Sequence, residues 1–361
     1  MSIEIDGKIV TPTVAPILTE GGTTLVQGRF FTEYLGADVS WNQPNQEMTI
    51  KTAGYTVVFK MASRAYTVNG VAYQIPAAYD PPVNTGSAMV PMRFLFESIG
   101  SAVSYDTATK TAKVSYFTGL TGSIKVSGST TVLPIMQSAA DKLMGQNGGL
   151  SVTVAGGGSG AGIKDTQSGA NNVGMSSRDL TADEMAEITP VKMANDAIAI
   201  IVNPKNPVTS LTTEQAAKIF LGEITNWTEV GGNDATIKVQ TRETGSGTLA
   251  TLEEMLLDRK TVVEKSIPFT SSALIKQAVA NDEDAIGFDS IGFVDSTVRA
   301  VSLNGIDASD ATVKNATYPL SRSLYVMTKG TAAGINARLI DYLRSAIVQQ
   351  EIVQKEGYIT L

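Results

Sequence analysis

The stretch RETGSGT, residues 242–248, places an arginine four residues before the step Ser246-Gly247-Thr248. The residues that follow, LATLEEMLLD, predict a helix. The two hydroxyls and the free backbone N–H groups then lie at a helix start, where the helix macrodipole is positive. Because the guanidinium, the hydroxyls and the N–H groups are all hydrogen-bond donors, this spacing predicts a site for an oxyanion.

Two further stretches share this design. VSGSTTVLP (126–134) predicts a strand, then Ser129-Thr130, then a helix, and VAGGGSGAGIKD (154–165) predicts a strand, a glycine loop with Ser159, and a helix. A single serine at a helix start is usually only an N-cap, but three such corners and an arginine favour a cradle for a small tetrahedral anion. Charge-assisted hydrogen bonds contribute roughly 1.5–3 kcal/mol each, so about six to eight of them would hold it tightly.

The composition narrows the chemistry that the chain can perform. Its 361 residues include no histidine and no cysteine, which excludes a Ser-His-Asp triad, cysteine nucleophiles, thiolate metal sites and disulfides. The formal net charge of −7 argues against a nucleic-acid partner, which requires a basic face. We therefore expect a binding protein without catalytic residues, metal site or cofactor.

A dinucleotide site is the competing interpretation of the glycine loop. Gly156, Gly158 and Ala161 fit the pattern G-x-G-x-x-A after a predicted strand, with Asp179 further along the chain. This fingerprint is weak when it stands alone, and it leaves Arg242 without a role.

An internal repeat marks the N-terminal third of the chain. Residues 23–50 align without a gap with residues 87–114, at an offset of 64 positions. Each copy predicts a short helix ended by glycine, a strand, a polar turn and a second strand. Between the copies, YTVVFKM and RAYTVNGVAYQI predict strands with a hairpin turn at Asn69-Gly70.

The repeated pattern VPMRF…ESIG resembles the copper amine oxidase N-terminal-like stalk domain over residues 1–117. Despite the family name, this segment lacks histidine and cysteine ligands for copper. We expect the repeated charges to form ion pairs that hold the small domain together, at Arg29, Arg93, Glu33 and Glu97. The alternative is that the domain binds a cell-wall polymer.

The remainder of the chain alternates predicted strands and helices, which is typical of an α/β fold with a mostly parallel sheet. A short Gly/Thr segment at 118–121 predicts a linker between residues 1–117 and a second domain at 122–361. In the helix predicted within TTVLPIMQSAADKLM, one face is apolar. That face consists of Val132, Met136, Ala139, Ala140 and Leu143.

This second domain resembles the phosphate-binding proteins of phosphate ABC transporters. The resemblance rests on SGSTTVLP, GGGSGAGI, VGMSSRDL, IFLGEITNW and RETGSGT, which occur in family order. It implies a two-lobed type II periplasmic-binding-protein fold, with lobe one at 122–197 and 318–361 and lobe two at 198–317. The phosphate contacts that it implies are Ser129, Thr130, Ser159, Ser177, Arg242, Ser246, Gly247 and Thr248.

One position departs from the best-known members, which have a carboxylate where Ser177 stands. A buried carboxylate accepts the proton of phosphate and rejects sulfate, which has no proton to donate near neutral pH. We therefore expect measurable competition by sulfate or arsenate. Arg178 and Asp179, which follow, are second-layer candidates: Asp179 either substitutes for the missing carboxylate or is solvated, and Arg178 either pairs with it or adds positive potential.

The resemblance implies a protein that captures inorganic phosphate outside the membrane and delivers it to the permease subunits of an ABC importer. MSIEIDGK lacks the basic start and apolar core of a signal peptide, which by itself fits either a cytoplasmic protein or a mature form. Because phosphate transport operates outside the membrane, we expect an extracellular, cell-surface or cell-wall-associated protein whose signal has been removed. Two alternatives remain: a phosphatase-like enzyme of the same fold, and a surface phosphate sensor or adhesion protein acting through the stalk domain.

Overall fold

The computed structural model describes residues 2–19, 22–61, 65–75 and 88–361, which form two compact units. Unit 1 comprises Met1–Ser123, Asp141–Ser151 and Thr331–Val348. Unit 2 comprises Ile124–Ala140, Val152–Gly330 and Gln349–Leu361. Two segments from the C-terminal two thirds of the chain therefore belong to the same unit as the N-terminal third.

The N-terminal part of unit 1 is mostly β, with two short helices among its described residues, rather than the predicted α+β. The helices are α1 (Arg29–Leu35) and α2 (Met92–Ser98). The strands are β1 (Ser2–Ile5), β2 (Lys8–Val10), β3 (Ile17–Leu18), β4 (Thr24–Gln27), β5 (Asp38–Asn42), β6 (Glu47–Lys51), β7 (Thr56–Lys60), β8 (Ala65–Val68), β9 (Val71–Gln74), β10 (Met89–Pro91), β11 (Ala102–Asp106) and β12 (Thr111–Ser115). They form three sheets, in the orders β11-β12-β1-β2, β10-β4-β3 and β5-β6-β7-β8-β9.

Equivalent hairpins follow the two short helices. Strands β5 and β6 pair antiparallel with Val39 opposite Ile50, and β11 and β12 pair with Val103 opposite Val114, at positions 64 residues apart. The predicted turn at Asn69-Gly70 is confirmed, because β8 and β9 pair around it and both turn residues have positive φ angles, 50° and 82°. Residues 62–64 and 76–87, which include parts of the repeat and of the predicted strands, lie outside the described residues.

The predicted ion pairs contribute little to the stability of the N-terminal part of unit 1. Arg93 and Glu97 do pair, at 3.3 Å, but both side chains are about half exposed, and such pairs are worth roughly 0–1 kcal/mol. Glu33 accepts a hydrogen bond from Thr13 instead. Apolar side chains supply the core, with Phe30, Phe31 and Phe96 all buried.

Helix α10 (Gly334–Arg344) completes the core of unit 1. The carboxylate of Asp341 accepts hydrogen bonds from the N–H of Ala53 and the hydroxyl of Tyr116, each at 2.7 Å. The guanidinium of Arg338 lies 3.8 Å from the ring centroid of Tyr116, a cation–π contact. Burial raises the pKa of Asp341 to about 6. The helix is therefore joined to the N-terminal sheets by buried polar contacts as well as apolar packing.

The predicted linker is held at both ends within unit 1. The hydroxyl of Thr118 donates to Asp6, and the N–H of Leu120 donates to the side chain of Asn147. The Asn147 amide in turn donates to the carbonyl of Phe117. The segment predicted as a linker is therefore fixed to its neighbours by side-chain hydrogen bonds.

Unit 2 is built on a sheet of mixed direction. Its strands are β13 (Thr121–Gly128), β14 (Gly149–Ala155), β15 (Val173–Ser176), β16 (Ile188–Val202), β17 (Ser210–Leu211), β18 (Lys238–Arg242), β19 (Ile267–Phe269), β20 (Ala285–Ser290), β21 (Arg299–Leu303) and β22 (Ser321–Lys329); the first two begin in unit 1. The main order is β14-β13-β15-β22-β16-β20-β18-β19. The expectation of a mostly parallel sheet was wrong, because β16 and β22 run antiparallel to each other and to their other neighbours β20, β21 and β15.

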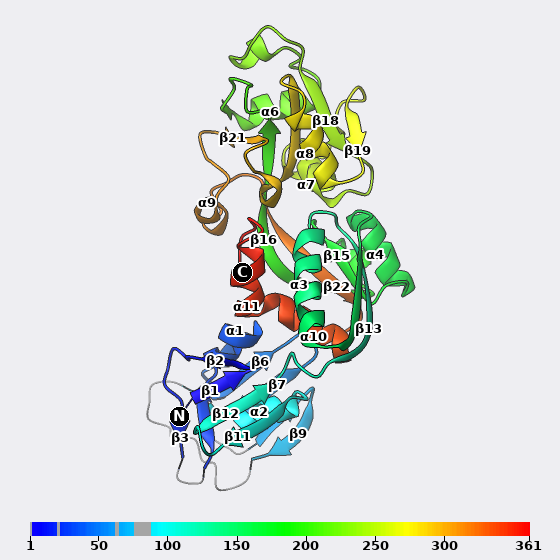
Figure 1. Cartoon of the computed structure of the whole chain (residues 1–361). Coiled ribbons are helices and arrows are strands. Elements are labelled where there is room, and N and C mark those ends of the chain that lie inside the picture. Colours follow the sequence, from blue (N-terminus) through cyan, green and yellow to red (C-terminus); the bar gives the residue numbers. More distant parts are fainter. Residues whose placement is uncertain (1, 20–21, 62–64, 76–87) are drawn as a thin grey trace. The chain divides into compact units, whose positions relative to one another are not determined.

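The long strand β16 joins two halves of unit 2. Its residues up to Ala197 pair with β22, and its residues from Ile198 onward pair with β20. One half contains β13, β15, β22 and α4 (Ser159–Ser168) (Figure 1). The other half contains β18 and β19 with helices α6 (Thr213–Phe220), α7 (Gly247–Met255) and α8 (Ser272–Ala280) (Figure 1).

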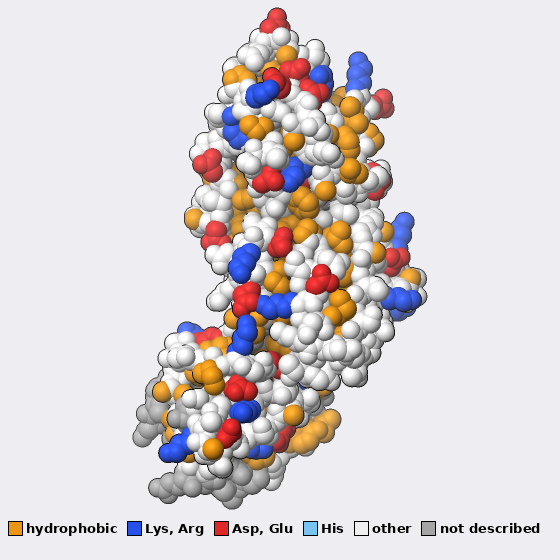
Figure 2. Space-filling model, viewed as in Figure 1, with side chains coloured by type: hydrophobic (Ala, Val, Ile, Leu, Met, Phe, Trp, Pro, Cys, Tyr) orange, Lys and Arg blue, Asp and Glu red, His pale blue; other side chains and the backbone are white. Residues whose placement is uncertain are grey.

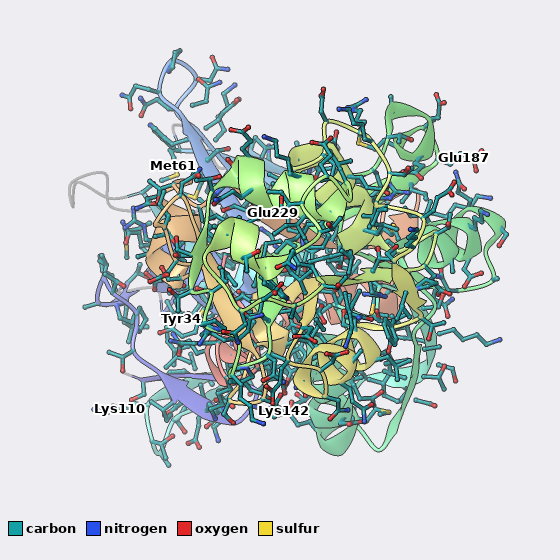
Figure 3. The ribbon with its side chains drawn as sticks, turned by 90° about the horizontal axis from the view of Figure 1, so that it is seen from above. Tyr34, Met61, Lys110, Lys142, Glu187 and Glu229 are labelled. Atoms are coloured by element: carbon teal, nitrogen blue, oxygen red, sulfur yellow. The ribbon has the colours of Figure 1, made fainter. Side chains whose placement is uncertain are left out.

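Local sequence signals position the helices of unit 2. The apolar face predicted for α3 (Leu133–Gln146) and the turn before it is confirmed, since all five of its residues are buried. The turn at Trp227 begins with a capping box between Asn226 and Glu229, an exposed residue that is labelled in Figure 3. Trp227 itself is buried, and its indole N–H donates to the carbonyl of Asp284. Within the described ranges, we find no helix with the length and apolarity needed to span a membrane.

Candidate anion-binding site

The starts of α4 and α7 meet in unit 2. The N–H of Gly160 donates to the carbonyl of Gly245 at 3.0 Å. A Cβ on Gly247 would overlap the hydroxyl of Ser159 and lie 2.6 Å from that of Ser177. Glycine is therefore required at this close approach, which brings two of the three predicted corners together.

The third corner, at Ser129-Thr130, joins them through Arg242. Nη2 of Arg242, at the end of β18, donates to Thr130 Oγ1 at 3.0 Å. The oxygens of Ser129 and Ser246 accept N–H groups of their own helix starts, at Val132 and Leu249. Because both hydroxyls are used as acceptors in these bonds, each retains a proton that it can donate to a ligand.

Arg242 is a buried cation whose counter-charge is not an adjacent carboxylate. Only 3 % of the residue is exposed. Its guanidinium donates to the carbonyls of Phe269 and Thr270 and to the hydroxyls of Ser272 and Thr130, at 3.0–3.4 Å. Desolvation lowers its pKa, and no carboxylate among the described residues lies within ion-pair distance of it. Four of its five N–H groups are thus held in place, and one remains on Nη1.

Ser177 lies directly beside the glycine loop. Its N–H donates to Ser159 Oγ at 3.0 Å, and the two hydroxyl oxygens are 3.3 Å apart. Both residues are fully buried. Since a hydroxyl can donate or accept, Ser177 can serve either a protonated or a fully ionised anion.

Two hydroxyls that the sequence analysis did not select belong to the same cluster. Thr131 Oγ1 lies 3.0 Å from Thr248 Oγ1 and 3.5 Å from Ser272 Oγ. The pair Ser271-Ser272 follows β19 and opens α8, so it repeats the strand–hydroxyl–helix pattern of the other corners. Applying that pattern once more would have found Ser272; Thr131 has no comparable signal.

Three buried charges behind these hydroxyls were also missed. Arg322 pairs with Asp196 at 2.7 Å and donates to the carbonyl of Ser177 at 3.0 Å. Asp289 is fully buried, and burial, the largest influence on it, raises its pKa to about 6. These residues come from β16, β20 and β22, which are distant in sequence, so local patterns could not have assembled them.

The two second-layer candidates face away from the cluster. Arg178 forms a two-pronged ion pair with Glu184, at 2.7 and 2.8 Å. The carboxylate of Asp179 is exposed and accepts a hydrogen bond from the hydroxyl of Tyr325 at 2.8 Å. Of the two predictions for Asp179, the solvated side chain is therefore the one observed. Arg178 pairs with Glu184, which the sequence analysis did not consider.

The arrangement suits an anion better than a metal ion or a nucleic acid. Within the described ranges, no three acidic side chains are grouped so that they could hold a metal ion. On the face shown in Figure 2, acidic and basic side chains are interspersed within each unit. What converges in unit 2 is instead a set of hydroxyls, helix-start N–H groups and one guanidinium, all of them donors to an oxyanion.

Comparison with known proteins defines the class of the chain. The family profile of the PBP superfamily domain matches residues 106–346, and that of the copper amine oxidase N-terminal domain matches residues 4–116. The phosphate-binding protein PstS of Bacillus subtilis (strain 168) is 34 % identical over 244 residues, which cover 66 % of this chain and 80 % of that protein.

Solved structures agree with this class. A putative phosphate ABC transporter substrate-binding protein from Clostridium perfringens, solved with bound phosphate, is 36 % identical with a TM-score of 0.63. An ABC-type phosphate transport receptor from Vibrio cholerae is also 36 % identical, with a TM-score of 0.57. Each match covers 66 % of this chain and 100 % of the solved chain. The fold is thus that of a PBP-superfamily binding protein.

Within that superfamily, the chain belongs to the PstS-like family of phosphate-binding proteins of ABC phosphate transport, and it carries a copper amine oxidase N-terminal domain. The members of this family are transport receptors and not enzymes.

Proposed function

We propose that this chain binds inorganic phosphate at the cluster around Arg242 and delivers it to the permease subunits of an ABC importer. The proposed contacts are Ser129, Thr130, Ser159, Ser177, Arg242, Ser246, Gly247 and Thr248. Thr131 and Ser272 hold this set in place from behind. The function operates outside the cytoplasmic membrane, at the cell surface.

The buried, unpaired state of Arg242 is the observation that carries this proposal. Removing a guanidinium from water is expensive, and carbonyl and hydroxyl partners return only part of that free energy. An anion that enters the cluster supplies the negative charge that Arg242 lacks, and it accepts hydrogen bonds from the surrounding hydroxyls. Phosphate, with four oxygens in tetrahedral geometry, can contact three helix starts and the guanidinium at once.

Calorimetric titration with inorganic phosphate tests this function directly. We expect one phosphate per chain with favourable enthalpy, because charge-assisted hydrogen bonds dominate the site. Titration of the chain with a sugar phosphate, which has a similar charge, is the matched comparison: its bulky ester should exclude it from a site enclosed by buried residues. Absence of phosphate binding at micromolar concentrations would overturn the proposal.

We further propose that residues 122–197 with 318–361 form one lobe and residues 198–317 the other, that each half of unit 2 belongs to one of these lobes, and that the lobes close around the ligand. Support comes from β16, whose pairing changes from β22 to β20 between Ala197 and Ile198. Small-angle scattering with and without phosphate should show a smaller radius of gyration in the bound protein. Identical scattering curves would contradict closure.

For the N-terminal domain, we propose that residues 1–117 arose by duplication of one helix–hairpin unit and bind a polysaccharide of the cell wall. Two exposed aromatic side chains support this role: Trp41 on β5 and Tyr105 on β11 occupy equivalent repeat positions and are 41 % and 39 % exposed. Flat aromatic faces pack against the C–H faces of sugar rings by dispersion. A polysaccharide consists of repeated sugar units, so two of its rings could each pack against one of the two equivalent aromatic side chains.

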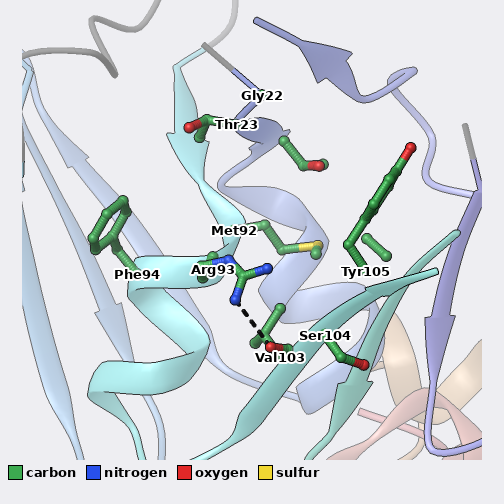
Figure 4. A pocket seen from close by; sticks show the side chains of 10 residues that line it. Gly22, Thr23, Met92, Arg93, Phe94, Val103, Ser104 and Tyr105 are labelled. Carbon is green, nitrogen blue, oxygen red and sulfur yellow. Dashed lines mark hydrogen bonds between the residues drawn. The ribbon is translucent and has the colours of Figure 1, made fainter. Parts of the chain in front are cut away.

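A pocket beside Tyr105 adds polar groups to this surface. Its volume is about 70 Å³, and its lining includes Tyr105, Arg93, Met92 and Thr23 (Figure 4). Nη1 of Arg93 donates to the carbonyl of Val103 at 3.0 Å, which holds the guanidinium at the pocket (Figure 4). Nη1 also donates to Glu97, so among the described residues the hydrogen bonds of Arg93 use Nη1 alone, which leaves Nε and Nη2 for sugar hydroxyl or carboxylate oxygens.

Co-sedimentation of the full chain with purified peptidoglycan tests this second role. The double change Trp41→Ala and Tyr105→Ala should reduce the bound fraction several-fold. Tyr73→Ala is the matched control, because Tyr73 is also exposed, at 45 %, but lies on β9 outside the repeated positions. Equal sedimentation of the double variant and the wild type would refute the role of the aromatic pair.

A further inference from the structure

A carboxylate without a full set of partners lies behind the proposed phosphate site. Asp289, on β20, is fully buried, and its Oδ1 accepts the N–H of Ser290 at 2.8 Å. Its Oδ2 is also buried and accepts no hydrogen bond from any residue that the structure describes. A buried, unpaired carboxylate oxygen is costly unless it has a proton to gain or a role to perform.

Asp289 is linked to the site through one hydroxyl. Ser272 lowers the pKa of Asp289 and so favours its charged form, and the Ser272 oxygen accepts Nη1 of Arg242 at 3.1 Å. Ser272 also lies 3.5 Å from Thr131, which contacts Thr248. The charge of Asp289 therefore acts on the guanidinium and on the orientation of the hydroxyls around it.

The other charges near Asp289 leave it as the compensating anion of Arg242. Arg322 on β22 acts on Asp289 but is neutralised by its ion pair with Asp196 on β16. Tyr358 is buried, and its pKa is raised far above its usual value by burial and by the charges of Asp196 and Asp289, so it stays neutral. Two carboxylates, Asp289 and Glu243, act on Arg242 from a distance. Glu243 is partly exposed, so Asp289 is the fully buried anion of the two.

A bound anion changes this balance. Before binding, Arg242 and Asp289 sum to zero; after a phosphate dianion binds, an ionised Asp289 would leave the buried cluster with two net negative charges. Like charges at short range in a dry site raise the affinity of the carboxylate for a proton. Taking one proton from solvent onto Oδ2 removes one of those charges.

We propose that anion binding at the Arg242 cluster is coupled to protonation of Asp289, which serves as the counter-anion of Arg242 in the empty protein and is neutralised when the ligand enters. Asp289 is a positioning residue, because it acts through Ser272 and Arg242 and does not touch the ligand. This inference rests on the proposed phosphate site. The burial-raised pKa of about 6 supports it, since only a small change is then needed to protonate the group near neutral pH.

The test is the number of protons taken up per phosphate bound. It is obtained by calorimetric titration at about pH 7 in buffers of different ionisation enthalpy. We expect the wild type to take up roughly half to one proton more per phosphate than Asp289→Asn, because the contribution of phosphate itself cancels in the comparison. Equal proton numbers in the two proteins would overturn the proposal.

Asp341→Asn is the matched control. Asp341 is also buried, and burial raises its pKa to about 6 as well, but it belongs to unit 1. Its replacement should leave the proton number at the wild-type value. A reduction as large as that of Asp289→Asn would show that the effect is not specific to Asp289 and would refute the proposal.

A second variant keeps the test decisive if Asp289→Asn does not fold. Ser272→Ala removes a hydroxyl that lowers the pKa of Asp289, so the carboxyl group is already protonated in a larger fraction of empty protein. Proton uptake on binding should therefore fall even though Asp289 is present, and an unchanged uptake would contradict the coupling. Absence of phosphate binding by the wild type is a distinct result that would refute the site itself.

Discussion

Two buried arginine–carboxylate groups, one in each unit, show how the same residue types serve structure or binding. In unit 1, Asp341 accepts two hydrogen bonds and Arg338 lies over the ring of Tyr116. In unit 2, among the residues that the structure describes, Asp289 keeps an oxygen without a hydrogen-bond partner, and no carboxylate lies within ion-pair distance of Arg242. A buried carboxyl group whose hydrogen bonds are satisfied within the fold serves structure, whereas a buried charge without an adjacent counter-charge indicates a place for a ligand.

The largest effect that would test this contrast is expected for Arg242→Ala. It removes the cation from a buried anion site, so phosphate affinity should fall by about 3–5 kcal/mol, or roughly 10²–10³-fold or more. Titration calorimetry measures the loss. Arg178→Ala is the control, because its ion pair with Glu184 faces away from the cluster, and it should change affinity little. Equal losses of phosphate affinity in both variants would contradict the assignment of Arg242, and not Arg178, to the binding site.

The next effect concerns the close approach of the helix starts. In Gly247→Ala, the added methyl group would overlap the hydroxyl of Ser159 and press on Ser177. We expect phosphate affinity to fall by about 2–3 kcal/mol, as overpacking displaces the donors. Gly145→Ala, in α3, has open space around the new methyl group and should bind phosphate normally. Wild-type affinity for Gly247→Ala would mean that the two corners are not part of one site.

In unit 1, the pH dependence of stability tests the structural carboxylate. The folded pKa of Asp341, about 6, lies above its ordinary value of 3.8, so its stabilising contribution is complete below pH 4 and is lost as the pH rises through 6. As the pH rises from about 4 to about 7, the unfolding free energy of Asp341→Asn should therefore increase by ~1–3 kcal/mol relative to that of the wild type.

Urea unfolding at both pH values measures this gain. Asp38→Asn is the control, because Asp38 pairs with Arg344 at the surface and is 68 % exposed. A relative stability of Asp341→Asn that does not change with pH would show that this carboxyl group does not titrate in the range given by its burial.

The smallest expected effect concerns anion choice. With a hydroxyl at Ser177, the site can donate to sulfate, so sulfate should compete measurably with phosphate in the wild type. In Ser177→Asp, a carboxylate would accept the proton of phosphate and repel sulfate, and the preference for phosphate should rise by about tenfold or more. Competition titrations measure the ratio. Complete exclusion of sulfate by the wild type would show that another group already performs this selection.

The binding corners were accessible from sequence because each is a local pattern. A strand, a hydroxyl or glycine, and a helix start follow one another within about ten residues, and their donors point toward the same end of the helix. The hairpin at Asn69-Gly70 was predictable for the same reason, since its turn chemistry lies in two adjacent residues. The residues behind the corners were not predictable, because Ser272, Asp289 and Arg322 meet only through strand neighbours far apart in the chain.

By itself, the sequence determined the repeat, the alternation of strands and helices, and the type of chemistry open to a chain without histidine or cysteine. These follow from local propensity and composition, which need no knowledge of distant contacts. Only the tertiary structure decided that β16 and β22 run antiparallel, that α10 completes unit 1, and that Arg242 and Asp289 are buried near each other in unit 2. Such outcomes depend on which buried groups find partners across long sequence separations, and that is settled by packing and desolvation of the whole chain.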